Sequence, residues 1–95
     1  MFIEAIAKKD VKTKKLIRRL KPNDIAVIKH RDIDEIAALS LVEKKPRIVI
    51  NAEESISGRY PNRGPSILVE AGINILELDN ENIFDSISEN SKITI

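Results

Sequence analysis

The sequence predicts one α/β domain, a small three-layer sheet fold whose core strands run parallel. The chain has 95 residues, which is the length of a single domain. Short aliphatic runs at residues 25–28, 48–50 and 73–78 alternate with segments of helical periodicity. An unbroken apolar run is typical of a strand that is buried on both faces. We therefore expect residues 1–95 to form one domain. Because strand-like sequence continues to the last residue, we also expect it to be the N-terminal domain of a longer protein.

The first elements follow from periodicity and charge. Residues 2–7 alternate weakly between apolar and polar side chains and predict a strand. In residues 12–20, Leu16 and Leu20 lie one helical turn apart among cations, which indicates a short amphipathic helix. A second strand, buried on both faces, follows at residues 25–28.

The second helix begins with a capping signal and ends at a proline. Asp32 can accept from the free amides of the first turn, and Glu35, three residues later, completes a capping box. Pro46 ends the helix. A strand at residues 47–51 then completes a βαβ unit, so its two strands should be parallel with a right-handed crossover. The expected buried stripe of the helix comprises Ile33, Ile36, Ala37 and Leu41.

The second half of the chain continues this alternation. Pro65 suits the first position of a third helix, because it has no amide hydrogen to leave unpaired. Gly72 favours a left-handed cap at the end of that helix. Residues 73–78 predict a third interior strand, which is followed by a short helix and a closing strand at residues 92–95.

Composition and motifs exclude several classes of function. The chain has no cysteine and one histidine, so neither a disulfide scaffold nor a structural zinc site is expected. No apolar run approaches the ~20 residues that cross a bilayer, and the start lacks the pattern of a signal peptide. We therefore expect a cytoplasmic protein without direct membrane insertion. The sequence has no P-loop, no dinucleotide fingerprint and no nucleophile elbow, so we predict no catalytic residues.

Charge is unevenly distributed along the chain. The formal net charge is +1, but residues 8–21 hold eight basic side chains against one acid, Asp10. Such a surface favours an anionic partner, although the same pattern also fits a solvated helix face. Nucleic acid is not expected as the partner, because no aromatic side chain for base stacking lies in this segment.

The polar connection at residues 51–65 is the main candidate for a binding site. It is long for a compact domain, and connections of this length commonly carry function. It joins the carboxyl end of a parallel strand to a helix N-terminus, where free amides and arginines suit a phosphate-containing ligand. In the alternative reading the polar side chains only close tight turns, and Arg59 pairs with a neighbouring glutamate. The candidate ligand-binding residues are Asn51, Ser55, Ser57, Gly58, Arg59, Asn62 and Gly64, with Arg63 beside them.

A second candidate cluster consists of His30, Asp32 and Asp34, which follow the strand at residues 25–28. Parallel strands end at the same edge of a sheet, so this cluster should lie beside Asn51. Two carboxylates near a histidine could hold a cation or act as acid and base. The alternative is structural, because Asp32 already serves as the expected helix cap.

Three runs of the sequence are similar to the N-terminal region of SteA-type proteins, bacterial proteins associated with the cytokinetic ring. The runs are residues 12–14 with 19–22 (KTK and RLKP), residues 24–34 (DIAVIKHRDID) and residues 55–65 (SISGRYPNRGP). Members of that family join such a region to a thiamin-pyrophosphokinase-like domain and a membrane-anchored C-terminal end. Arg63 stands where the family commonly has an apolar residue, which favours Arg59 over Arg63 as the binding arginine.

The resemblance implies a non-catalytic regulatory domain of a cell-division protein that binds an anionic small molecule or nucleotide. Arg59, Ser57 and Asn62 would hold the anion, with His30 and Asp34 on the same rim. Two alternatives stay open. The domain could complete the active site of the thiamin-pyrophosphokinase-like part of the full-length chain, or it could dock a protein partner through residues 8–21.

The order of elements also resembles the swivelling β/β/α domains of phosphoenolpyruvate-utilising enzymes. Those domains carry a phosphorylated histidine at the start of the helix after the central loop. In this chain that place is occupied by Arg63, Gly64 and Pro65, without a histidine. The resemblance therefore extends to the fold and not to phosphoryl relay.

Overall fold

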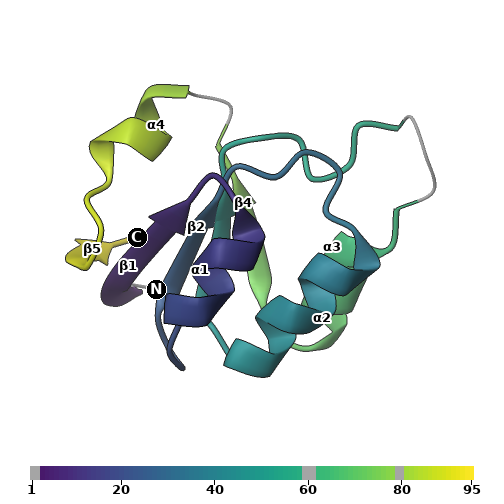
Figure 1. Cartoon of the computed structure of the whole chain (residues 1–95), viewed down its shortest axis with the longest axis horizontal. Helices are drawn as coiled ribbons and strands as arrows, with labels where there is room; N and C mark the ends of the chain where they lie inside the picture. Colours follow the sequence, from purple (N-terminus) through teal and green to yellow (C-terminus); the bar gives the residue numbers. More distant parts are fainter. Residues whose placement is uncertain (1–2, 59–61, 79–80) are drawn as a thin grey trace.

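Strands and helices alternate along the whole chain in the computed structural model, which describes residues 3–58, 62–78 and 81–95 (Figure 1). The α/β class predicted from the sequence is confirmed. Within the described ranges the elements are β1 (Glu4–Asp10), α1 (Thr13–Arg19), β2 (Ile25–Ile28), α2 (Glu35–Lys44), β3 (Ile48–Asn51), α3 (Gly64–Glu70), β4 (Asn74–Glu77), α4 (Glu81–Ser86) and β5 (Ser91–Thr94).

The strands form one sheet in the order β4-β3-β2-β1-β5. β1, β2, β3 and β4 are parallel to one another, and β5 is antiparallel to β1. The predicted parallel βαβ unit is confirmed. The prediction that residues 73–78 form an interior strand is wrong, because β4 lies at the edge of the sheet and its side chains are half-buried or exposed. An edge strand that packs against a covered face also needs apolar residues. The sequence of β4 therefore resembles that of an interior strand.

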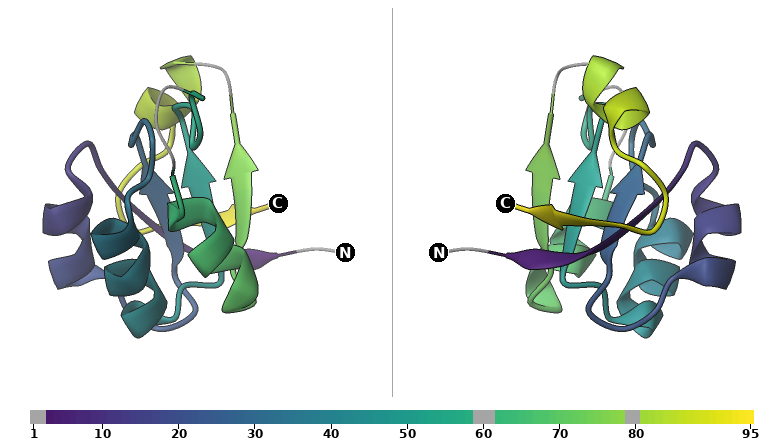
Figure 2. Two further views of the ribbon diagram at one scale, coloured as in Figure 1. Left: turned by 90° about the vertical axis from the view of Figure 1, so that its right-hand side faces the viewer. Right: turned by 90° about the vertical axis from the view of Figure 1, so that its left-hand side faces the viewer.

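Successive parallel strands are added in one direction, so right-handed crossovers place α1, α2 and α3 on the same face of the sheet (Figure 2). β1 serves two partners. Its second half pairs with β2 from Ala7 onward, and its first half pairs with β5 up to Ala7. The ribbon of β1 and β5 runs across the remaining strands on the face away from those three helices (Figure 2). Helices, central strands and this ribbon give the three layers.

The core is divided by the sheet into two clusters, because side chains of a strand point alternately to its two faces. On β2, Ala26 and Ile28 pack under the helices, whereas Ile25 and Val27 pack under the ribbon and α4. Phe84 of α4 closes the second cluster. An unbroken apolar run is required at β2 because both of its faces are covered, as the sequence predicted.

The start of α2 differs from the prediction. Asp34 is the N-cap and accepts a hydrogen bond from the amide of Ala37 at 2.7 Å, whereas Asp32 has a left-handed φ of 53° in the preceding loop. The helix therefore begins two residues later than expected, and Ile36 is 78% exposed. Leu41 is buried as predicted, and Ala38 is the other buried residue of the helix. No helix in the described ranges is both long enough and apolar enough to cross a bilayer.

Candidate functional site

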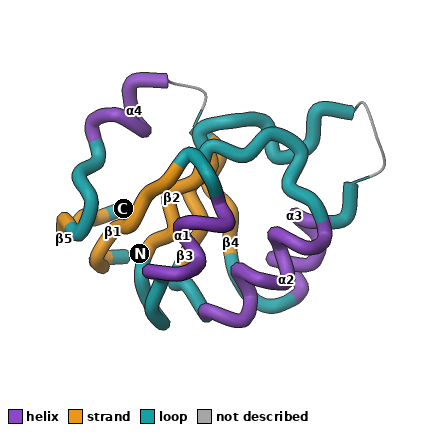
Figure 3. The backbone as a smooth tube through the Cα atoms, in the orientation of Figure 1, coloured by secondary structure: helices purple, strands orange, loops and turns teal. Residues whose placement is uncertain are grey.

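The loops that follow β1, β2 and β3 gather at one edge of the sheet (Figure 3). The strand register explains this arrangement, because Ile28 is the partner of both Asp10 on β1 and Asn51 on β3. Residues shortly after these positions are therefore neighbours in space. The prediction that the His30 cluster and Asn51 share one edge of the sheet is confirmed.

Asn51 fastens the loop after β2 to the loop after β3. Its side-chain oxygen accepts from the amide of His30 at 3.1 Å, and its side-chain nitrogen donates to the carbonyl of His30 at 2.9 Å. The same nitrogen donates to the hydroxyl of Ser55 at 2.9 Å. Asn51 is fully buried and Ser55 nearly so. Both residues therefore hold the backbone of His30 in place and offer no open surface to a ligand.

Asp32 makes a second connection between the same loops. Its two carboxylate oxygens accept from the amide and the hydroxyl of Ser57, at 2.7 and 2.8 Å. Backbone pairing adds to this, since the amides of Asp32 and Ile33 donate to the carbonyls of Glu54 and Ser55. Asp32 and Ser57 therefore have a structural role, but it is to join the two loops, and not the helix cap expected of Asp32 or the tight turn expected of Ser57.

The first turn of α3 packs directly on the loop after β2. A Cβ atom on Gly64 would collide with the carbonyl oxygen of Ile33, so only glycine fits there. Asn62 closes the turn by donating to the carbonyl of Ser55 at 2.7 Å and accepting from the amide of Gly64 at 3.2 Å. Gly58 is exposed, and its φ of 86° favours glycine. Arg59, the expected anion ligand, lies outside the described residues.

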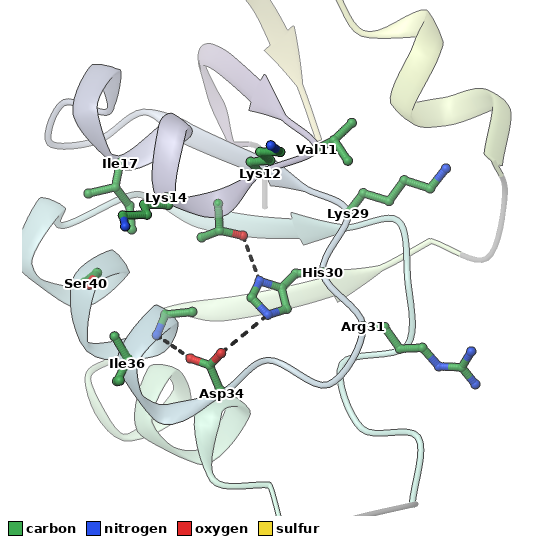
Figure 4. Close-up of a pocket in the computed structure, with 12 residues that line it drawn as sticks. Val11, Lys12, Lys14, Ile17, Lys29, His30, Arg31, Asp34, Ile36 and Ser40 are labelled. Atoms are coloured by element: carbon green, nitrogen blue, oxygen red, sulfur yellow. Dashed lines mark hydrogen bonds and ion pairs between the residues drawn. The ribbon is translucent and has the colours of Figure 1, made fainter.

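A cleft of about 680 Å³ lies between the N-terminal parts of α1 and α2 (Figure 4). Its size is within the range of small-molecule sites. The two predicted residues His30 and Asp34 line it, and the other residues come from the turn after β1, the loop after β2, and the two helices. The lining residues are Val11, Lys12, Thr13, Lys14, Ile17, Lys29, His30, Arg31, Asp34, Ile36, Ala37 and Ser40.

His30 is held from three sides. Its Nδ1 lies 2.8 Å from the hydroxyl of the buried Thr13, and its Nε2 lies 3.8 Å from a carboxylate oxygen of Asp34 (Figure 4). Asn51 fixes its backbone. The His30 side chain nevertheless keeps 24% of its surface exposed. The imidazole is therefore oriented by the protein and still accessible from the cleft.

The cleft carries a marked positive charge. Four cationic side chains line it, against the single carboxylate of Asp34. Arg31 has one distant partner, Glu54 at 3.9 Å, and the structure gives no ion pair with any described residue for the other three cations. The four cations are Lys12, Lys14, Lys29 and Arg31.

Two other cations of residues 8–21, Lys8 and Arg19, are paired with acids. Lys8 is buried and pairs with Asp24 at 2.6 Å. Arg19 pairs with Asp10 at 3.1 Å and with Glu89 at 2.9 Å. The hydrogen bonds that Arg19 donates to Glu89, and then to Asp10, raise the pKa of Arg19 above its ordinary value. The basic segment is therefore not one continuous anion-attracting face.

Asp10 also sets the entry into α1. Its carboxylate accepts from the amide of Lys12 at 2.9 Å, and this hydrogen bond, with help from Arg19, lowers the pKa of Asp10 below its ordinary value. The contact fixes the turn that carries Val11 and Lys12 into the cleft. Sequence reasoning missed Lys12, Lys14 and Lys29 as site residues, although their position after two adjacent parallel strands was a usable signal.

The imidazole of His30 and the carboxylate of Asp34 lie side by side in the cleft, and the hydroxyl of Thr13 next to the imidazole is buried. In residues 3–58, 62–78 and 81–95, no group of three histidine or carboxylate side chains is placed to hold a metal ion.

Fold and cleft together define a small α/β domain with a basic, partly apolar cleft at the carboxyl ends of two adjacent parallel strands. No protein-family model, curated protein or solved structure matches the chain. The assignment of a function therefore depends on the geometry of the cleft.

Proposed function

We propose that this chain is a non-catalytic regulatory domain that binds an anionic small molecule in the cleft between α1 and α2. The observation that carries the proposal is that four cationic side chains and an accessible imidazole line the cleft, against one carboxylate. An excess of cations around one cleft attracts anions. An anion with several oxygen atoms can meet them at once, which favours phosphate over a single carboxylate.

Asp34 reduces this positive charge only in part. One of its carboxylate oxygens is engaged as the cap of α2, and the other faces the imidazole of His30. The side chain is 64% exposed, so water screens its charge more than that of a buried acid. The acid therefore orients His30 and leaves the lysines available.

The proposed location lies beside the one that the sequence suggested. The expected anion site was the N-terminus of α3, with Arg59, Ser57 and Asn62 as ligands. The polar atoms of Ser57 and Asn62 make hydrogen bonds within the loops, and Gly64 packs against Ile33. These contacts favour the cleft around His30 as the place for the ligand.

The resemblance to SteA-type proteins supplies the proposed setting. In that setting the chain is a cytoplasmic domain of a cell-division protein, and the bound anion reports a metabolic state to the rest of the full-length chain. The resemblance covers nearly the whole sequence, including the residues that precede and follow His30.

The proposal is tested by titration with inorganic pyrophosphate, which carries the required charge and nothing else. Lys14 lines the cleft, whereas its neighbour Lys15 on the same helix does not. Lys14→Ala and Lys29→Ala should each weaken binding by about fivefold, since an exposed charge pair contributes roughly 1 kcal/mol. Lys15→Ala removes the same charge and should leave the affinity unchanged.

Isothermal calorimetry gives the affinities, and amide chemical shifts locate the site. Shifts confined to residues 11–14 and 29–37 are expected. If Lys14→Ala and Lys15→Ala lose the same affinity for pyrophosphate, the binding is general attraction to positive charge, and a defined site is refuted. A native protein that does not bind pyrophosphate at low salt would refute the proposal outright.

A further inference from the structure

Most cations of the cleft come from the loops after β1 and β2, and most of its apolar residues come from the helices, with Val11 as an apolar residue on the loop side. The loops supply Lys12, Lys29 and Arg31, and the side chains of Lys29 and Arg31 extend away from His30 (Figure 4). The bodies of α1 and α2 supply Ile17 and Ile36, which lie together on the other side of the cleft with Ser40 (Figure 4). Lys14 is the one cation on the helical side. The cleft therefore has a charged loop end and a largely apolar helix end.

The helix end leaves an apolar surface uncovered. Ile36 on α2 is 78% exposed, and Ile17 on α1, which also lines the cleft, is half-buried. Burial of such side chains against an apolar partner is favourable because it removes their surface from water. Ala37 adds a small apolar side chain to the lining of the cleft.

The size of the cleft also exceeds what a simple anion fills. At about 680 Å³ it lies in the middle of the range for sites that hold organic molecules. Orthophosphate or pyrophosphate would occupy the loop end and leave the helix end filled with water. Ser40 at the helix end offers a hydroxyl, which suits an uncharged body with a few polar atoms.

We infer that the ligand is a phosphate ester of mononucleotide size. Its phosphate lies at the loop end against Lys12, Lys29 and His30, and its planar base lies at the helix end between Ile17 and Ile36. This inference rests on the proposed anion-binding function and adds the class of ligand. It requires two separable contributions to affinity, one from charge and one from apolar contact.

The experiment separates these contributions with matched probes and matched variants. The probes are orthophosphate, the four common nucleoside monophosphates, and the corresponding nucleosides. At least one nucleotide should bind about tenfold more tightly than orthophosphate, and its nucleoside should bind more weakly than the nucleotide. Lys29→Ala should weaken both phosphate and nucleotide.

Two exposed apolar residues of α2 give the decisive pair of variants. Ile36 lines the cleft, and Leu39, which is 50% exposed, does not. Ile36→Ser should weaken the nucleotide about fivefold and leave the affinity for orthophosphate unchanged. Leu39→Ser should change neither. Because both side chains are largely exposed, both variants should fold, and a thermal melt checks this.

The outcomes distinguish failure of the ligand class from failure of the anion site. If no phosphate-containing probe binds, both proposals fall. If orthophosphate binds as tightly as every nucleotide, or Ile36→Ser behaves like Leu39→Ser, the nucleotide class is refuted while the anion site stands. Binding to a membrane surface would also refute the nucleotide class. In that case the protein would co-sediment with vesicles of anionic lipid, and both serine variants would lose this binding because the membrane contacts the whole exposed side of α2.

Discussion

At Gly64 the first turn of α3 approaches the backbone of Ile33 so closely that no side chain fits between them. This contact seats α3 on the loop that carries His30 and Asp34 into the cleft. Gly72, by contrast, stands in open space, and its φ of 82° gives the reason for glycine there. The two glycines are therefore required for different reasons, one by packing and one by backbone conformation.

We expect Gly64→Ala to lower the free energy of unfolding by about 3 kcal/mol, because the added methyl group must displace backbone atoms in a packed interior. Gly72→Ala should cost about 1 kcal/mol, the penalty for a side chain in the left-handed region. Urea unfolding followed by circular dichroism measures both values. Similar losses for the two variants would show that the loop after β2 moves aside and that the contact at Gly64 is not rigid.

Among the elements, those buried on both faces could be predicted most completely. Their apolar runs leave little choice, and β2 and β3 were placed with the correct orientation. The start of α2 was misplaced, because the capping-box spacing of Asp32 and Glu35 favours Asp32 over Asp34 as the cap. Only the contact of Asp32 with Ser57, distant in the chain, selects between them.

The candidate site was predicted in part for a similar reason. His30 and Asp34 follow a strand that was recognised, so their edge of the sheet could be named. Lys12 and Lys14 could not be separated from the other cations of α1 by periodicity alone. Acids from other strands and loops pair with Lys8 and Arg19, which removes these two cations from the candidates. The sequence does not show which cations have such partners.

Arg19 ties the end of α1 to two other segments and makes stability depend on pH. Burial alone would raise the pKa of Glu89, but hydrogen bonds from the amide of Lys9 and from Arg19 outweigh it, and the pKa lies below its ordinary 4.5. The pKa of Asp10 likewise lies below 3.8. A depressed carboxyl pKa stabilises the fold above the unfolded value, and this contribution is lost as pH falls through the folded value.

Arg19→Gln should therefore destabilise the protein by about 1 kcal/mol at neutral pH, a small value because solvent screens the partly exposed pairs. The difference between variant and native protein should shrink as the pH falls from about 5 to about 3, where both carboxyl groups take up protons. Urea midpoints across this range provide the measurement. A difference that does not change with pH would mean that Arg19 acts through packing of its methylene groups.

On the scale of the whole molecule, the cleft is lined by four cations and one carboxylate although the chain carries a formal charge of only +1. Lys8 and Arg19 of the basic segment pair with acids, whereas the structure gives Lys12 and Lys14 no ion pair with a described residue. Attraction between the cleft and a small anion should therefore be electrostatic and open to screening by dissolved ions.

Raising the salt concentration from about 0.05 M to about 0.5 M should weaken pyrophosphate binding by about tenfold, since the screening length falls to a few ångströms. The unfolding midpoint should change little, because the core is aliphatic and lies beneath both faces of the sheet. A matched concentration of a neutral osmolyte serves as the control. Affinity that is indifferent to salt would place the anion in a desolvated pocket and not in this open cleft.

The amide of Asn51 joins the floor of the cleft to the polar connection that follows β3. A molecule that shifts the His30 backbone should therefore also disturb the hydrogen bonds of this amide to His30 and Ser55. The side-chain protons of Asn51 are shielded from solvent by the fold. Their nuclear magnetic resonance signals should exchange slowly with water, and they offer an internal sensor of occupancy that needs no added label.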